Sequence, residues 1–196
     1  MGAHESVEHH EHAEHAAGHN KQIALVIAVL ALFLALSETL GKSAQTLALS
    51  SNVEASNLWS FFQAKNGRMT VVKTAAENRS LDLAGVTDPT QKAAIEKQID
   101  AWTKAAARWD DEPATGEGRK QLAERAKSAE HDRDLAMSRY HHYEVASAAF
   151  QIGIVLCSAA VITGMALLAF VAGGLGLVGL AFTAIGFFAP HAVHLF

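Results

Sequence analysis

The first 20 residues carry the side chains best suited to hold a metal ion. Three glutamates, Glu5, Glu8 and Glu11, are each followed four residues later by a histidine, which is about one helical turn. Imidazole and carboxylate suit zinc, copper or nickel, and a pKa near 6.5 leaves most histidines neutral at pH 7. A low-complexity tail offers no preformed site, so we expect a disordered segment, 1–20, with weak, adventitious metal binding and no dedicated cofactor. The expected ligands are His9, His10, His12, His15 and His19.

Glu38 is an acidic residue close to a long apolar run, Ile23–Leu36. An acidic side chain near the membrane interior suggests ion binding or a proton-transfer step, which makes Glu38 a candidate for an ion pathway. Lys42 follows four residues later, an arrangement that also favours a simple ion pair at the membrane surface. We favour the ion pair and keep the ion pathway as the alternative.

Several classes of protein are excluded by composition and motif. Cys157 is the only cysteine, lies in an apolar run and has no nearby base, and no GxSxG sequence occurs, so nucleophilic catalysis finds no support. Residues 42–144 balance 15 basic against 15 acidic side chains within a net charge of −4, which leaves no basic face for nucleic acid. We expect a protein without enzymatic activity and without a nucleic-acid partner.

The distribution of charge predicts a membrane protein. All 16 lysine and arginine residues lie between Lys21 and Arg139, and no charged residue occurs from Val145 to Phe196. About 20 apolar residues cross a lipid bilayer, and this last run is long enough for two crossings. The sequence predicts transmembrane helices at residues 21–41, 146–170 and 173–189, a tight hairpin at 171–174 and a C-terminal tail at 190–196.

Between the first two predicted spans, residues 42–145 show helical periodicity. Apolar residues recur at spacings of four and three from Leu40 to Ala76, and Thr87 or Asp88 before Pro89 marks the start of another helix. Helices are expected to about residue 80, at 90–112 and at 119–145. The predicted fold is an all-α integral membrane protein with three transmembrane helices and an elongated, coiled-coil-like helical stalk between the first and second.

Two surfaces of these helices are suited to close packing. Small residues line one face of the second and third spans, which lets helix backbones approach closely in lipid. Large apolar residues line the seam of the first stalk helix. The expected packing or oligomerisation residues are Leu58, Trp59, Phe62, Met69, Gly153, Gly164, Gly176, Gly179 and Gly186.

These surfaces favour a non-enzymatic membrane scaffold that self-associates or serves as an accessory subunit of a larger membrane complex. The alternative is an oligomeric ion or metal channel with Glu38 in the pathway. Basic residues near the span ends, such as Lys42 and Arg139 against Lys21, favour a cytoplasmic stalk and C-terminus with a periplasmic N-terminal tail.

Two segments resemble a known family. EASNLWSFFQAK at residues 54–65 and HYEVASAAFQIGIVL at residues 142–156 are similar to an uncharacterised bacterial membrane family, domain of unknown function 4337. The resemblance implies a multi-pass protein of the bacterial inner membrane, with an acidic, often histidine-bearing N-terminal tail and a helical middle domain. It implies no activity.

Overall fold

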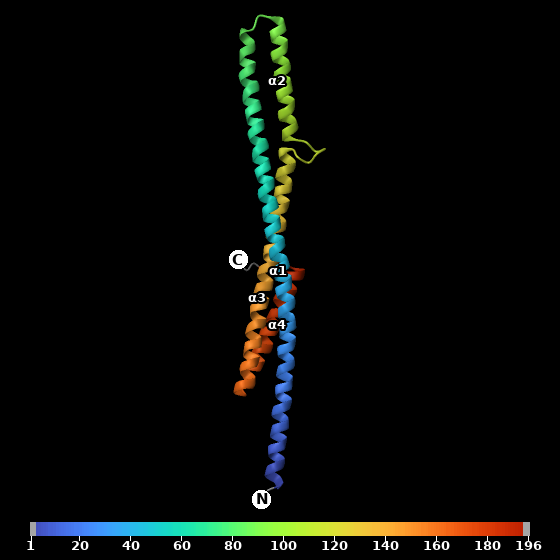
Figure 1. Ribbon diagram of the computed structural model, residues 1–196, viewed down its shortest axis with the longest axis vertical. Helices are drawn as coiled ribbons and strands as arrows, with labels where there is room; N and C mark the ends of the chain where they lie inside the picture. Colours follow the sequence, from blue (N-terminus) through green and yellow to red (C-terminus); the bar gives the residue numbers. More distant parts are fainter. Residues whose placement is uncertain (1–2, 194–196) are drawn as a thin grey trace. The chain divides into compact units, whose positions relative to one another are not determined.

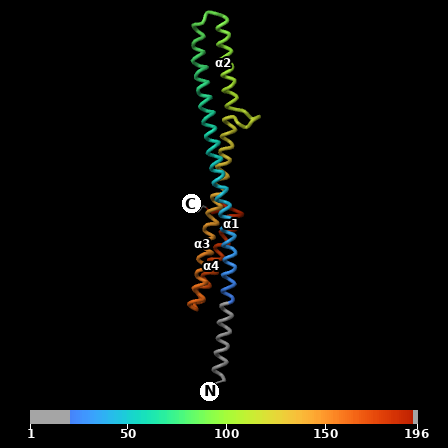
Figure 2. Tube along the Cα trace, viewed as in Figure 1, coloured from blue at the N-terminus to red at the C-terminus, as the bar shows by residue number. Residues whose placement is uncertain are grey.

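A computed structural model describes residues 21–193, and within them every regular element is helical. The predicted all-α class is therefore confirmed, and three of the helices are long and apolar enough to cross a membrane. Residues 1–20, with the five histidines predicted to bind metal, lie outside the described residues. The elements are α1 (Ala3–Asp82), a short 3-10 helix (Leu83–Gly85), α2 (Pro89–Asp110), α3 (Arg119–Thr163) and α4 (Ala166–Phe188) (Figures 1 and 2).

The chain divides into two compact units, and α1 and α3 each contribute to both. We call residues 49–133 the hairpin unit, and the described parts of 1–48 and 134–196 the apolar unit. The predicted stalk, 42–145, is longer at both ends than the hairpin unit, because its first and last turns pack with the apolar helices.

The apolar unit is a packing of α1 with the second part of α3 and with α4. One buried cluster joins the three helices, and its smallest members allow the backbones to approach. Leu30 comes from α1, Phe150 from α3 and Ala172 from α4, and the ring of Phe150 is fully buried. The other buried members are Ile23, Ala146, Cys157 and Ala160.

The turn between α3 and α4 lies at Gly164 and Met165 rather than at residues 171–174, so the predicted spans 146–170 and 173–189 need correction. Gly164 has a φ of 70°, a left-handed conformation that glycine adopts without steric cost. Its N–H donates to the carbonyl of Ala160 at 2.9 Å. Gly173 and Gly174 stay helical inside α4, because next to them Ala172 is fully buried and packing offsets the low helix propensity of glycine.

In the hairpin unit, α2 is antiparallel to α1, and the first turns of α3 continue in the direction of α2 (Figure 1). The start of α2 is as predicted: Pro89 is in its first turn and the Asp88 carboxylate accepts a hydrogen bond from the N–H of Thr90 at 2.9 Å. A buried cluster then joins α1 to α3. Its members are Ala55, Leu58, Leu122, Ala126 and Ala129, with Trp59 and Phe62 packed against them.

Candidate functional site

The buried face of α4 consists of small residues, and larger side chains of α1 and α3 fill the space that they leave. A Cβ atom built on Gly179 would lie 2.7 Å from the Cε1 atom of Phe150, and one on Gly176 would lie 2.8 Å from Cδ2 of Leu30. A Cβ atom on Gly186 would lie 3.0 Å from the Cβ of His142. Each glycine is therefore a point of close helix contact within one chain.

The other two glycines predicted for packing differ from each other. Gly153 of α3 is buried, and a Cβ atom there would lie 3.2 Å from the Cδ1 atom of Leu30. Gly164 is exposed at the turn, where a Cβ atom would meet nothing within 4 Å. Four of the five predicted glycines therefore lie at close helix contacts inside the apolar unit. The fifth, Gly164, lies in the turn that connects α3 to α4.

Buried polar groups also join the three apolar helices. Ser37 of α1 is fully buried, and its hydroxyl donates to the carbonyl of Tyr143 at 3.4 Å. The hydroxyl of Thr183 on α4 lies 3.3 Å from that of Ser37 and donates to the carbonyl of Gly179 at 2.9 Å. A hydrogen bond in an apolar surrounding fixes the rotation of each helix, because leaving such a group unpaired there is costly.

Buried His142 holds the segment that follows α4. It is 1% exposed, and its Nε2 atom lies 3.0 Å from the carbonyl oxygen of Pro190. The hydroxyl of Ser138, one turn earlier on α3, donates to the same oxygen. Nδ1 of His142 has no hydrogen-bond partner. The proton of a neutral ring is therefore assigned to Nε2, where it can be donated to the carbonyl.

Glu38 lies in a polar groove between α1 and α3 with a volume of about 450 Å³. Its carboxylate accepts a hydrogen bond from Nε2 of Gln151 at 3.2 Å. The expected ion pair with Lys42 is not found among the ion pairs of residues 21–193, although Lys42 lines the same groove. Gln151 comes from a distant part of the chain, so its contact with Glu38 could not be read from local spacing.

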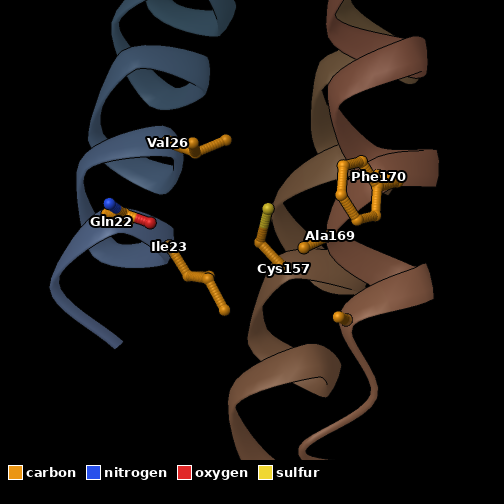
Figure 3. A pocket seen from close by; sticks show the side chains of 7 residues that line it. Gln22, Ile23, Val26, Cys157, Ala169 and Phe170 are labelled. Carbon is orange, nitrogen blue, oxygen red and sulfur yellow. The ribbon is translucent and has the colours of Figure 1, made fainter. Parts of the chain in front are cut away.

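A smaller, apolar pocket of about 200 Å³ surrounds the single cysteine. Figure 3 shows the sulfur of Cys157 in the space between the side chains of α1 and Phe170 of α4. No acidic or basic side chain lines this pocket, so it offers apolar contact without a group to activate the thiol. Its lining residues are Gln22, Ile23, Val26, Cys157, Ala166, Ala169 and Phe170.

In the hairpin unit, a cluster of charges binds the α2–α3 connection to α1. Lys65 of α1 is 8% exposed, and its ammonium nitrogen lies 3.6 Å from a carboxylate oxygen of Glu112 and 3.8 Å from one of Glu117. Arg119 pairs with Asp110 at 2.7 Å and donates to the side-chain oxygen of Asn66 at 2.9 Å. The arrangement anchors a connection that has no apolar core of its own.

The exposed side chain of Asp111 joins the end of α2 to the start of α3. It accepts hydrogen bonds from Gln121 at 2.7 Å and Lys120 at 3.1 Å, and these two contacts hold the pKa of its carboxyl below the usual range. Because the folded-state pKa is lowered, the contribution of Asp111 to stability is present at neutral pH and is lost as the pH falls through that value.

The predicted stalk seam is buried within the hairpin unit itself. Leu58 is 7% exposed and Met69 is 5% exposed. The indole N–H of Trp59 donates to the Glu130 carboxylate at 2.9 Å, and its ring meets that of Phe62 edge to face. The residues predicted to serve either packing or oligomerisation therefore have partners inside one chain.

Within residues 21–193 no three histidine, cysteine or acidic side chains come together in a way that could hold a metal ion. The sequence did not reveal the buried roles of Ser37 and His142. The small-residue face that includes Thr183 was the signal available for Ser37, and the two histidines that follow Pro190 were the signal available for His142.

Comparison with known families supports one assignment. The family model described as domain of unknown function (DUF4337) matches residues 19–189. That range includes the described part of α1 and the whole of α2, α3 and α4. No curated protein and no solved structure matches the chain. The chain belongs to the DUF4337 family.

Proposed function

We propose that the protein is a non-enzymatic membrane scaffold that associates with copies of itself through the hairpin unit. The observation that supports this is a second stripe along α1, on a face other than the buried seam. Its positions recur at spacings of three and four, carry no charge and are exposed. We call it the outer stripe, and it consists of Leu49, Val53, Ser56, Ser60, Ala64, Gly67, Val71, Thr74 and Asn78.

A second copy of the chain is the partner that suits this surface. Large apolar side chains near its ends are well exposed, with Val53 at 59% and Val71 at 69%. Small residues such as Ser60 and Gly67 lie between them and would let two helices approach closely. An uncharged stripe can face its own copy across a two-fold axis without like-charge repulsion.

We also propose that the apolar unit spans the bacterial inner membrane three times. Its outward side chains are large and apolar, including Leu32 at 67%, Ile162 at 84% and Phe170 at 79% exposure, and lipid would cover them. The basic residues favour a cytoplasmic hairpin unit and C-terminus, with the N-terminal tail in the periplasm. The hairpin unit would then be a coiled-coil-like stalk.

The self-association proposal predicts the effect of placing charge on the outer stripe. The double variant Val53→Lys, Val71→Lys should weaken association roughly a hundredfold, because like charges would face each other in the interface. Light-scattering mass in mild detergent, measured over a range of protein concentrations, gives the oligomeric state.

The matched control is Ala94→Lys, Ala101→Lys, which adds the same charge to exposed positions of α2. It should associate like the wild-type chain. A wild-type chain that is monomeric at every concentration would contradict the proposal, as would equal dissociation of both double variants.

The alternative function is an oligomeric ion or metal channel with Glu38 in the pathway. The hydrogen bond from Gln151 to Glu38 in a polar groove favours it, because the contact keeps a carboxylate at the edge of an apolar helix body. If the channel exists, Glu38→Gln should abolish flux of protons, potassium or zinc into liposomes. Glu144→Gln, in the same groove, is the control. The scaffold function predicts no flux from either variant or from the wild-type chain.

A further inference from the structure

A second groove in the apolar unit combines an apolar wall with a single charged side chain. It lies among α1, α3 and the end of α4 and has a volume of about 450 Å³. Tyr143 is the one lining residue that it has in common with the groove of Glu38. Its lining residues are Leu40, Ser43, Ala44, Leu47, Ala136, Arg139, Tyr143 and Phe187. Only Arg139 among them carries a charge at neutral pH.

Arg139 has no anionic partner among the described residues of its unit. Its Nε atom is buried without a hydrogen-bond partner, and no ion pair among the described residues includes it. Arg79, Arg108 and Arg119 each pair with a carboxylate, and Arg68 and Arg125, which have no ion pair among the described residues, are exposed. A partly buried guanidinium group with an unused donor is costly unless an anion meets it.

The groove is placed at the level where the apolar helices end. On α3 no charged residue occurs after Glu144, and α4 ends at Phe188, next to the lining residue Phe187. In a membrane this is the level of the lipid headgroups, with acyl chains on one side and water on the other. Arg139 is therefore positioned for a ligand that is anionic at one end and apolar at the other.

We propose that this groove binds an anionic phospholipid, with Arg139 holding the phosphate. A guanidinium group presents forked N–H donors that match phosphate oxygens, and Ser43 offers a hydroxyl in the same groove. Leu40 and Phe187 provide the apolar contact for an acyl chain. The groove has no acidic side chain to receive a choline or ethanolamine cation, so a headgroup with net negative charge is preferred. The proposal rests on the membrane placement proposed above.

Native mass spectrometry of the full chain in mild detergent tests the proposal, with phosphatidylglycerol and phosphatidylcholine titrated separately. The wild-type chain should retain one phosphatidylglycerol per copy in preference to phosphatidylcholine. Arg139→Gln should weaken phosphatidylglycerol binding roughly tenfold, as expected for loss of a charge-assisted hydrogen bond, and Arg139→Lys should restore part of it. Lys42→Gln removes a cation from the neighbouring groove and should bind like the wild-type chain.

A second variant tests the same groove in case Arg139→Gln does not fold. Ser43→Phe leaves Arg139 in place and narrows the groove at an exposed position, so it should also reduce binding while the helical content stays unchanged. Equal retention of the two lipids by the wild-type chain would overturn the proposal, and so would unchanged binding by Arg139→Gln. Displacement of the lipid by inorganic phosphate alone would show an anion site and overturn the lipid assignment. Recovery of the chain in the soluble fraction without detergent would instead overturn the membrane placement.

Discussion

Replacing Gly179 with leucine should destabilise the apolar unit by about 3 kcal/mol, the upper end of what overpacking a helix contact costs. A Cβ atom at this position would lie 2.7 Å from Cε1 and 2.8 Å from Cζ of Phe150. The Phe150 ring is fully buried against other helices, so it cannot swing aside. Thermal unfolding of the detergent-solubilised chain, followed by circular dichroism, measures the loss.

Gly174→Leu is the matched control for this prediction, because it adds the same side chain to the same helix. A Cβ atom on Gly174 would meet nothing within 4 Å, so the variant should unfold like the wild-type chain or at a slightly higher temperature. Gly176→Ala should be intermediate, since its neighbour is the flexible end of Leu30. Equal destabilisation by leucine at positions 174 and 179 would refute the packing described for α4.

Truncation of Leu122 to alanine should destabilise the hairpin unit by about 3 kcal/mol, through lost apolar burial and the cavity that remains. Leu122 is fully buried and is the largest aliphatic side chain that α3 contributes to the cluster around Leu58. Trp59 packs against that cluster, and all 3 tryptophans of the chain lie in the hairpin unit. Tryptophan fluorescence during denaturant titration therefore reports on the unit that the mutation changes.

Leu81→Ala provides the comparison, since Leu81 lies in the same unit with 75% of its surface exposed. The free energy of unfolding of the hairpin unit in this variant should differ from that of the wild-type chain by less than about 0.5 kcal/mol. If Leu122→Ala unfolded at the same denaturant concentration as Leu81→Ala, the α1–α3 contact in the hairpin unit would have to be rejected.

Much of the fold follows from composition and spacing. The absence of charge after Glu144 indicates the two last apolar helices, and the spacing of Leu58, Lys65 and Met69 identifies the buried seam of α1. Asp88 before Pro89 marks a helix start that depends only on local hydrogen bonding. These features are local or periodic, so one sequence carries enough information to find them.

The turn between α3 and α4 could not be located in the same way. Glycine is present both at Gly164 and at 173–174, and composition favours the denser group. Which glycine adopts a positive φ depends on where the helices must part to bring Phe150 against Gly179, a contact between distant parts of the chain. The prediction was wrong because helix packing decides between two locally similar sites.

The candidate sites also combine features that are visible in the sequence with features that depend on how the helices pack. Glu38 stands out in the sequence because an acidic residue near an apolar run is unusual, but its partner Gln151 depends on the tertiary fold. Arg139 has no distinguishing sequence signal, since it is one of many charged residues before Val145. Its lack of an acidic partner, and the groove around it, exist only once three helices are packed.

The short connection at Gly164 and Met165 has a consequence for biosynthesis. Two residues between α3 and α4 cannot separate the helices, so in the membrane placement proposed above the pair would enter the bilayer together as one insertion unit. Neither Thr163, Gly164 nor Met165 carries charge, which makes the transfer of this tip across the hydrocarbon inexpensive. The tip holds no topogenic signal of its own. If the apolar unit spans the membrane as proposed, the orientation of both helices would therefore depend on the charged residues that precede Val145.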